Sequence, residues 1–216
     1  MNQIKSVVFD LDGTLMSSNS TIYKCTLRTF EEFNILAEMP EDEFNNKIGL
    51  HFGDIFRDFN IDVPDIEEFI TRYKTHYFDF IDDTYVFPNV VDTLKYLKDK
   101  NISLALLTTK AQEQAELILE HFALSKYFDL IMGRRPDIAI KPAPDALLKI
   151  CSDLGVDAAS ALMVGDSELD IQCGKNAGSL TCAVTFGYRK EEDLKLLNPD
   201  YIISDMKELV KIVSNP

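Results

Sequence analysis

The segment that most constrains the fold is residues 7–14, where an apolar run ends in two acids and a glycine. The segment reads Val7, Val8, Phe9, Asp10, Leu11, Asp12, Gly13 and Thr14. An unbroken apolar run of this length is typical of a strand that is buried on both faces, as in a parallel sheet covered by helices. Ligands of open α/β sheets bind just beyond the carboxyl ends of the strands. Since residues two apart in an extended chain point the same way, Asp10 and Asp12 are predicted to converge at that edge.

Paired aspartates at the end of a strand suit two kinds of chemistry. Crowded carboxylate and carbonyl oxygens are ligands for Mg²⁺, and an aspartate can act as a nucleophile toward phosphorus. The alternative is structural, because Asp-Gly also favours a hairpin turn, in which the acids would only be solvated. Residues 7–14 fit both interpretations, so the choice between them depends on the rest of the sequence.

Charge excludes some partners. The 216 residues include 22 basic and 36 acidic side chains, which give a formal net charge of −14. Nucleic acids and anionic membrane surfaces are bound through Lys and Arg, so neither is an expected partner. A small anionic substrate is compatible with this charge if a metal and a few bases invert the field inside a cleft. The sequence is compatible with a monomer or a homodimer.

Cysteine usage and hydropathy predict a cytoplasmic protein. The four cysteines show no spacing typical of disulfide frameworks or zinc sites, so we expect reduced, mostly buried thiols. No signal peptide is recognised at the N-terminus, and no apolar run is long enough to span a bilayer.

The distance between the first two strands predicts a second domain. After the strand at residues 7–9, the next strand pattern is at 102–107, and a single crossover needs far fewer residues than lie between them. Apolar residues at helical spacing fill much of this interval. We therefore expect a Rossmann-like core from residues 1–17 and 86–216, with an all-α cap domain of residues 18–85 acting as a hinged lid.

From residue 102 onward, strand and helix patterns alternate. Strands are predicted at 102–107, 128–132, 161–164, 180–185 and 201–203, and helices at 111–122, 142–154, 167–176 and after 204. This alternation predicts an α/β fold with a doubly wound parallel sheet and right-handed crossovers.

Three further sites fall near the same edge of this sheet. Thr108 ends a predicted strand, where its hydroxyl could hold phosphoryl oxygens or cap the next helix. Lys141 precedes a proline that suits a helix start, so it is either part of an anion site or a surface lysine in a proline turn. Asp166 follows the strand at 161–164, and Asp170 comes four residues later, so its side chain can face Asp166 across one helical turn. These two acids could serve a metal, or could instead be an N-cap and a partner of the helix dipole.

The combined set resembles the four motifs of the haloacid dehalogenase-like (HAD) superfamily. Its members here are Asp10-Leu11-Asp12-Gly13-Thr14, Thr108, Lys141-Pro142 and Gly165-Asp166-Ser167 with Asp170. The long helical insert after the first motif resembles the phosphoglycolate phosphatase-like branch. Asp12 favours phosphoryl chemistry, because dehalogenase members would be expected to lack the second acid of the first motif.

The resemblance implies a role for each motif residue. Asp10 would be the nucleophile that forms an aspartyl-phosphate, and Asp12 the acid and base for the leaving group and the water. Thr108, Thr109 and Lys141 would bind the phosphoryl group. Mg²⁺ would be held by Asp10, the backbone carbonyl of Asp12 and Asp166. Asp170 and Ser167 would support the metal site from behind these ligands.

The insert carries a glycine-bracketed loop that resembles the substrate-facing loop of related caps. Lys47, Gly49 and His51 of this loop could contact a carboxylate or hydroxyls at the far end of a substrate. The alternative is a turn between helices with a solvated histidine.

These features predict a Mg²⁺-dependent phosphatase of small phosphorylated metabolites, with phosphoglycolate-type monoesters first. Three alternatives stay open. Pyrophosphatases of the branch resemble this chain in Thr108-Thr109-Lys110, where phosphoglycolate phosphatases more often have asparagine beside the lysine. A β-phosphoglucomutase-like phosphotransferase resembles it after Lys141, although Gly165 fits hydrolases better. A non-catalytic phosphoacceptor module is disfavoured, because its aspartate should follow the third strand.

Overall fold

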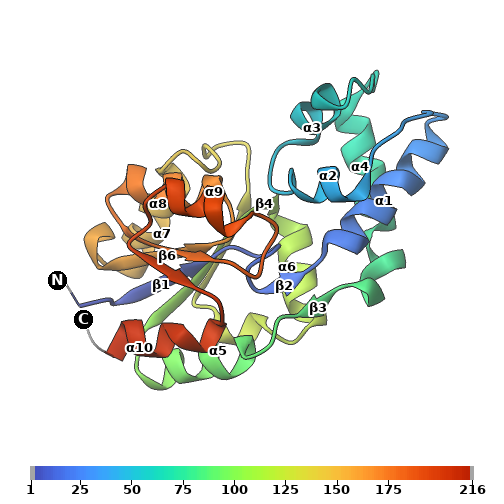
Figure 1. The fold of residues 1–216 in the computed structure, drawn as a ribbon. Helices are drawn as coiled ribbons and strands as arrows, with labels where there is room; N and C mark the ends of the chain where they lie inside the picture. Colours follow the sequence, from blue (N-terminus) through green and yellow to red (C-terminus); the bar gives the residue numbers. More distant parts are fainter. Residues whose placement is uncertain (1–2, 215–216) are drawn as a thin grey trace. The chain divides into compact units, whose positions relative to one another are not determined.

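The computed structural model describes residues 3–214, which divide into two compact units (Figure 1). An α/β unit comprises the chain up to Leu15 and from Val86 onward, and a helical unit comprises Met16–Tyr85. The division lies slightly before the expected boundary at residue 17. The reason is that β2 (Met16–Ser17) pairs with β3 (Tyr85–Val86) in a two-stranded sheet where the chain leaves and re-enters the α/β unit.

The α/β unit contains a six-stranded parallel sheet in the order β5-β4-β1-β6-β7-β8. Its strands are β1 (Ser6–Phe9), β4 (Ser103–Ala111), β5 (Leu130–Arg134), β6 (Ala161–Gly165), β7 (Leu180–Val184) and β8 (Tyr201–Ile203). All four residues of β1 are buried, and Phe9 pairs with Leu106 on one side and Val164 on the other. The predicted doubly wound parallel sheet is therefore confirmed, with the apolar run of residues 7–9 near its centre.

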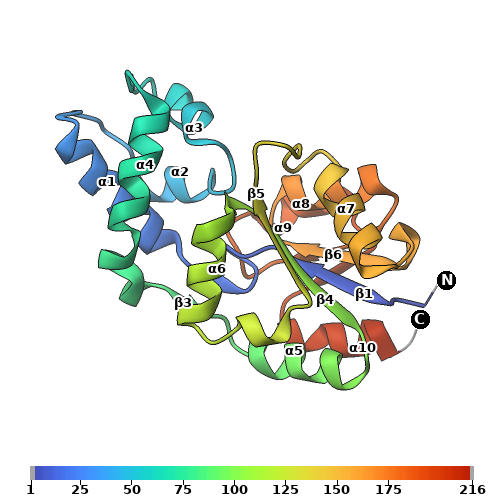
Figure 2. The same cartoon turned by 180° about the vertical axis from the view of Figure 1, so that it is seen from behind.

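Helices cover both faces of this sheet. They are α5 (Val90–Asp99), α6 (Gln112–His121), α7 (Asp145–Leu154), α8 (Glu168–Ala177), α9 (Glu191–Leu196) and α10 (Leu209–Ser214), with 3-10 turns at Ser125–Tyr127, Ala158–Ser160 and Met206–Glu208. Figures 1 and 2 show α5 and α10 on one face and α7 and α8 on the other. Leu147 and Ile150 of α7 are fully buried against Val8 and Met163 of the sheet, which fixes the strand ends that carry the motifs.

Two elements differ from the sequence prediction. Strand β4 continues to Ala111 instead of ending at residue 107, and its register shifts between Leu107 and the pairing of Ala111 with Arg134. Helix α7 begins at Asp145 instead of at Pro142. A residue that precedes proline is disfavoured in the α conformation, so Lys141 and Ala143 delay the start of the helix.

The helical unit is built around aromatic side chains. Its helices are α1 (Asn19–Glu32), α2 (Glu41–Asn45), α3 (Phe52–Asp58) and α4 (Ile66–His76), followed by a 3-10 helix at Tyr77–Asp83. Phe69 is fully buried, and its ring centroid lies 5.0 Å from that of Phe56 and 5.3 Å from that of Phe30. Rings from three helices thus form the centre of this unit, and burial of each contributes roughly 1.5–3 kcal/mol.

The cysteines and the helix lengths bear on the expected location. All four cysteines are buried. Among residues 3–214, no helix has the length and apolar character that crossing a membrane requires. A cytoplasmic location stays a prediction.

Candidate active site

Parallel pairing brings Asp10 and Asp166 together. Asp10 directly follows Phe9, and its N–H donates to the carbonyl oxygen of Val164 at 2.9 Å. Asp166 directly follows Gly165, the last residue of β6. Because β1 and β6 are neighbours in register, both carboxylates lie at the same edge of the sheet, and both are buried.

Lys141 joins two of the acids. Its Nζ lies 2.7 Å from Oδ1 of Asp10 and 2.5 Å from Oδ1 of Asp170. Burial alone would lower the pKa of Lys141, but the charges of the two aspartates outweigh it and raise this pKa above its ordinary value. Lys141 is therefore a buried ammonium and not a solvated lysine in a surface turn.

Asp170 connects this lysine to the start of α8. Its Oδ2 accepts hydrogen bonds from the backbone N–H of Ser167 at 3.0 Å and from the Ser167 hydroxyl at 2.6 Å. Asp170 and Ser167 form a capping box at the N-terminus of the helix. Asp170 thus caps α8 with one oxygen and holds Lys141 with the other, so the structural role and the site role coexist.

Asp166 is held by the loop of the first motif and by a second loop that the sequence analysis did not assign to the site. The Thr14 hydroxyl donates to Oδ1 of Asp166 at 3.3 Å, and the Tyr188 N–H donates to Oδ2 at 2.8 Å. A Cβ atom at either Gly13 or Gly187 would collide with the Asp166 side chain. The signal for the second loop is Gly187 itself, which lies shortly after the end of β7 at the edge where β1 and β6 end.

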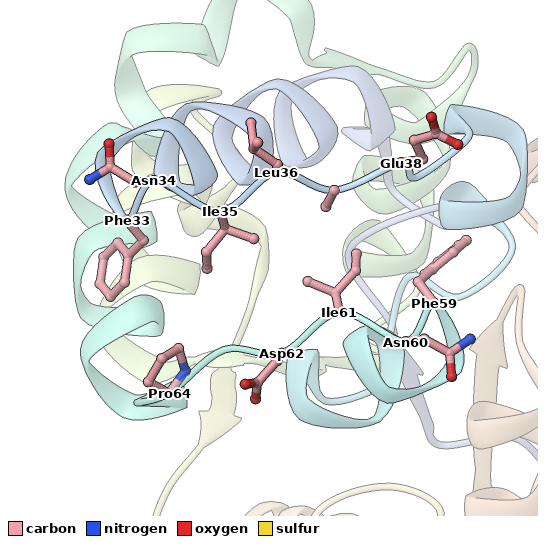
Figure 3. Close-up of a pocket in the computed structure, with 11 residues that line it drawn as sticks. Phe33, Asn34, Ile35, Leu36, Glu38, Phe59, Asn60, Ile61, Asp62 and Pro64 are labelled. Carbon is pink, nitrogen blue, oxygen red and sulfur yellow. The ribbon is translucent and has the colours of Figure 1, made fainter.

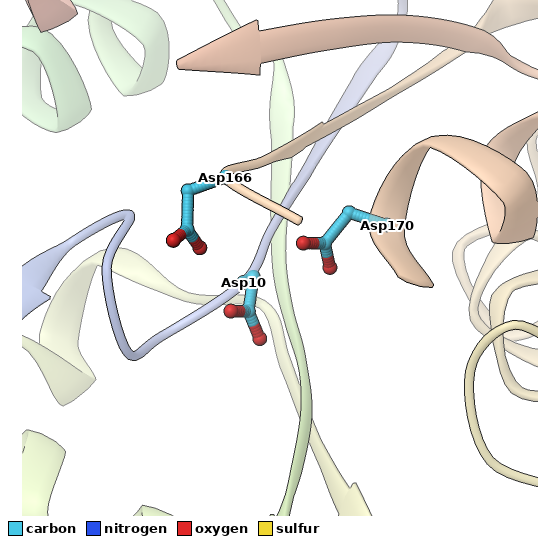
Figure 4. A group of neighbouring side chains, drawn as sticks. All are labelled: Asp10, Asp166 and Asp170. Carbon is cyan, nitrogen blue, oxygen red and sulfur yellow. The ribbon is translucent and has the colours of Figure 1, made fainter. Parts of the chain in front are cut away.

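Three carboxylates lie close enough to share a cation. Figure 4 shows Asp10, Asp166 and Asp170 grouped at the strand ends, and one oxygen of each lies within 4.8 Å of the others. Burial, and then the charge of Asp170, raises the pKa of Asp166 to about 7. Burial also raises the pKa of Asp10 well above its ordinary value, although Lys141 opposes this shift.

The residues of this cluster fit a magnesium ion. One ammonium cannot neutralise three buried carboxylates, and uncompensated buried charge is costly. A divalent cation with a preference for oxygen ligands supplies the missing positive charge. The donor set of Asp10, Asp166 and Asp170 is therefore one that could hold Mg²⁺.

Asp12 points to a different partner. Its Oδ2 lies 3.2 Å from Nζ of Lys110, and their side chains are 12% and 7% exposed. Lys110 belongs to the extension of β4 that the sequence analysis did not predict. The Lys110 N–H donates to the Thr108 hydroxyl at 3.2 Å. Thr108 is buried and does not cap α6, which begins at Gln112, and Thr109 lies half-buried beside it.

The residues proposed for substrate specificity have roles within the helical unit. Nζ of Lys47 lies 2.5 Å from Oδ2 of Asp58 and 5.8 Å from the ring centroid of Phe59. His51 is the N-cap of α3, and its Nδ1 accepts a hydrogen bond from the Gly53 N–H at 3.1 Å. Gly49 has φ of 101°, which favours glycine. Their contact with substrate stays a prediction.

The helical unit also contains an open groove. Figure 3 shows it between the loops that follow α1 and α3, and its volume is about 660 Å³. The lining includes Ile35, Leu36, Ile61 and Pro64 together with the acids Glu38 and Asp62. None of the predicted site residues lines this groove.

One ion pair beside the cluster was also missed. Nε of Arg189 donates to Oε2 of Glu168 at 2.8 Å, and the Arg189 side chain is only 9% exposed. This pair joins the loop that holds Asp166 to the first turn of α8.

Comparisons with known proteins agree with these motifs. A family model described as "Haloacid dehalogenase-like hydrolase" matches residues 7–184. A Clostridium perfringens protein named "Putative pyrophosphatase PpaX" is 38% identical over 213 residues, covering 97% of each chain. "Pyrophosphatase PpaX" of Halalkalibacterium halodurans is 34% identical, covering 98% of this chain and 97% of its own.

A solved structure gives the same result. A crystal structure described as a "predicted phosphoglycolate phosphatase" from Haemophilus somnus superimposes with a TM-score of 0.88 at 26% identity, covering 98% of this chain and 99% of its own. The chain therefore belongs to the haloacid dehalogenase-like hydrolase family, in the phosphoglycolate phosphatase-like branch that its motifs predicted.

Proposed function

We propose that this protein is a Mg²⁺-dependent phosphohydrolase of small phosphorylated metabolites that works through an aspartyl-phosphate on Asp10. The observation that supports this is the buried cluster of Asp10, Asp166 and Asp170 around the ammonium of Lys141. Phosphoryl transfer needs mainly positioning and charge neutralisation. A cluster that combines carboxylates, an ammonium and a place for a cation supplies both.

The chain's own residues account for two chemical steps. A carboxylate oxygen of Asp10 attacks phosphorus, and the bond from phosphorus to the leaving oxygen breaks as Asp12 donates a proton to that oxygen. Ionised Asp12 then takes a proton from water, whose oxygen attacks phosphorus. The bond from phosphorus to Asp10 breaks, inorganic phosphate leaves, and Asp12 is protonated again.

The remaining residues hold the phosphoryl group and the metal. The Thr108 hydroxyl, Thr109 and a third N–H of Lys141 would donate to the phosphoryl oxygens. Asp10, Asp166 and the backbone carbonyl of Asp12 would hold Mg²⁺, with Asp170 and Ser167 behind them. When bound, Mg²⁺ would neutralise negative charge on the phosphoryl oxygens.

Two substrate types have specific support. Structural similarity to a protein described as a phosphoglycolate phosphatase supports phosphoglycolate-type monoesters. Higher sequence identity to proteins named pyrophosphatase, and the run Thr108-Thr109-Lys110, support inorganic pyrophosphate. Both are small anions, which suits a chain whose net charge of −14 disfavours large polyanions.

The helical unit is proposed to act as a lid. It is inserted between β1 and β4, and short strands mark both points at which the chain joins it to the α/β unit. Two short connections permit hinge motion, and closure of a lid excludes water from a phosphorylated intermediate.

The test is to measure phosphate release and the covalent intermediate together. Asp10→Asn removes the nucleophile and is expected to lower turnover of p-nitrophenyl phosphate by at least roughly 10⁴-fold. The wild type, quenched with acid during turnover of ³²P-labelled substrate, should carry hydroxylamine-sensitive label that the variant lacks. Asp153→Asn, an exposed acid paired with Lys149 on α7, is the control. Turnover by Asp10→Asn at the wild-type rate with Mg²⁺ present would refute the nucleophile assignment.

A further inference from the structure

The ion pair of Lys110 and Asp12 is placed by the extension of β4. The strand continues past Thr108 to Ala111, which pairs with Arg134 of β5. This extension carries Lys110 beyond the strand end, where its Nζ lies 3.2 Å from Oδ2 of Asp12. The lysine side chain is 7% exposed, so its ammonium gives up most of its hydration, and such a charge needs anionic partners.

The two lysines at this edge have different surroundings. Lys141 lies between two carboxylates, those of Asp10 and Asp170, at 2.7 and 2.5 Å. Lys110 is paired with Asp12, which is half-buried. An ammonium has three N–H donors and is attracted to any further anion that comes within a few ångströms.

The position of Asp12 defines what that further anion is. This step rests on the proposed function, in which Asp12 protonates the leaving oxygen. A proton donor must lie about 2.6–3.2 Å from the atom that it protonates. Since Nζ of Lys110 is 3.2 Å from Oδ2 of Asp12, a leaving oxygen that is protonated by this Oδ2 lies within roughly 6 Å of Nζ. A charge a few bonds beyond that oxygen is then within reach of the ammonium.

We propose that Lys110 is a specificity-determining residue that selects substrates whose leaving group carries a negative charge next to the reacting oxygen. The second phosphoryl group of pyrophosphate and the carboxylate of a phosphoglycolate-type ester share this chemistry. An uncharged alkyl leaving group lacks it. In a chain of net charge −14, a local ammonium on the leaving-group side offsets the repulsion that such substrates would meet.

The experiment compares kcat/KM for three substrates in matched variants. Inorganic pyrophosphate and phosphoglycolate have anionic leaving groups, and ethyl phosphate is the uncharged counterpart of phosphoglycolate. Lys110→Met removes the charge while keeping the length of the side chain. It is expected to slow all three reactions, because Asp12 loses its partner. A hydrogen bond to a charged group is worth about 1.5–3 kcal/mol. The preference for anionic over uncharged leaving groups should therefore fall about 10- to 100-fold.

Two further variants make the result specific. Lys110→Arg keeps a charge at this position and should retain more of the preference for anionic leaving groups than Lys110→Met. Lys110→Arg also tests the inference if Lys110→Met does not fold. Lys149→Met removes an exposed lysine that is paired with Asp153 at 2.9 Å, and it should leave the preference unchanged. The ratio of pyrophosphate to phosphoglycolate activity in the wild type tells which anion the site favours.

Three results would overturn the inference. Equal slowing of all substrates in Lys110→Met would mean that Lys110 serves only Asp12, while the proposed function stands. A wild type that hydrolyses ethyl phosphate as well as the anionic esters would also leave the function intact but remove the selectivity. A wild type that hydrolyses none of the three with Mg²⁺ present would instead remove the proposed function.

Discussion

The α/β unit buries four charged residues, Asp10, Lys141, Asp166 and Asp170, each less than 10% exposed, whereas no buried residue of the helical unit is charged. The helical unit instead buries aromatic rings, and its ion pairs are partly exposed, such as that of Lys24 with Asp83 at 2.9 Å, whose side chains are 47% and 35% exposed. Buried charges cost stability unless they are paired or bind a cation. Aromatic rings stabilise a core without that cost.

This difference indicates where each unit is constrained. In the α/β unit, the buried charges of the cluster are expected to lower stability while they supply the catalytic groups. Substitutions there should therefore change both the activity and the effect of Mg²⁺ on stability. In the helical unit, substitutions of exposed charges should change little, because exposed ion pairs contribute only about 0–1 kcal/mol. Each of the following predictions tests this contrast, and they run from the largest expected effect to the smallest.

Removal of the buried ammonium should have the largest effect. Lys141→Met leaves Asp10 and Asp170 without their shared partner, so it should lower the free energy of unfolding by about 3–5 kcal/mol. It should also lower kcat/KM by at least roughly 10³-fold, because the phosphoryl group loses a cation. Chemical denaturation and steady-state kinetics measure the two effects.

Lys24→Met is the matched change in the helical unit. It also breaks an ion pair, but one whose lysine side chain is 47% exposed. We expect a loss below about 1 kcal/mol. Similar losses of stability from both variants would contradict the contrast between the two units.

Asp166 should make the stability of the metal-free protein fall as pH rises. Its folded pKa is about 7, while an unfolded aspartate has a pKa of about 3.9. Between these values the folded state binds more protons, so this group's contribution to stability is present at low pH and is lost as pH rises toward 7. The melting temperature without metal should fall over this range. Mg²⁺ should raise it most above pH 7, because only the ionised carboxylate binds the cation.

The helical unit contains a carboxylate whose pKa is shifted in the opposite direction, that of Glu32. Oε1 of Glu32 lies 3.0 Å from Nε2 of His76, and this hydrogen bond lowers the pKa of Glu32. Its contribution is lost as pH falls, so it cannot produce a loss of stability on the alkaline side. Asp166→Asn should therefore flatten the decline toward pH 7, and an unchanged profile in this variant would show that another group is responsible.

The fold of the α/β unit could be predicted from the sequence because it follows from local patterns along the chain. The apolar run of residues 7–9 and the alternation after residue 102 determine a parallel sheet, and parallel strands end at one edge. Asp10 and Asp166 meet for that reason, and Lys141 reaches Asp10 from the loop between β5 and α7. The contacts of Asp166 with Thr14 and Tyr188 were not predictable, because they depend on loops whose path no periodicity encodes.

The pairing of Lys110 with Asp12 was missed for a similar reason. It depends on the extension of β4 beyond residue 107, and the register shift there interrupts the alternation that would mark a strand. In the helical unit, spacing predicted helices but could not distinguish a capping residue from a substrate-binding one. His51 is the clearest case of this ambiguity.

Substitution of His51 should have the smallest effect, and it distinguishes helix capping from substrate binding. Its Nδ1 accepts the Gly53 N–H at 3.1 Å as the N-cap of α3, so His51→Ala should cost roughly 1 kcal/mol of stability. Asparagine is a good N-cap but lacks the imidazole, so His51→Asn should restore the melting temperature. If capping is the whole role of His51, KM for pyrophosphate and phosphoglycolate should be the same in wild type and His51→Asn. A rise in KM in His51→Asn at unchanged melting temperature would instead assign His51 to substrate binding. The helical unit would then contribute to chemistry as well as to packing.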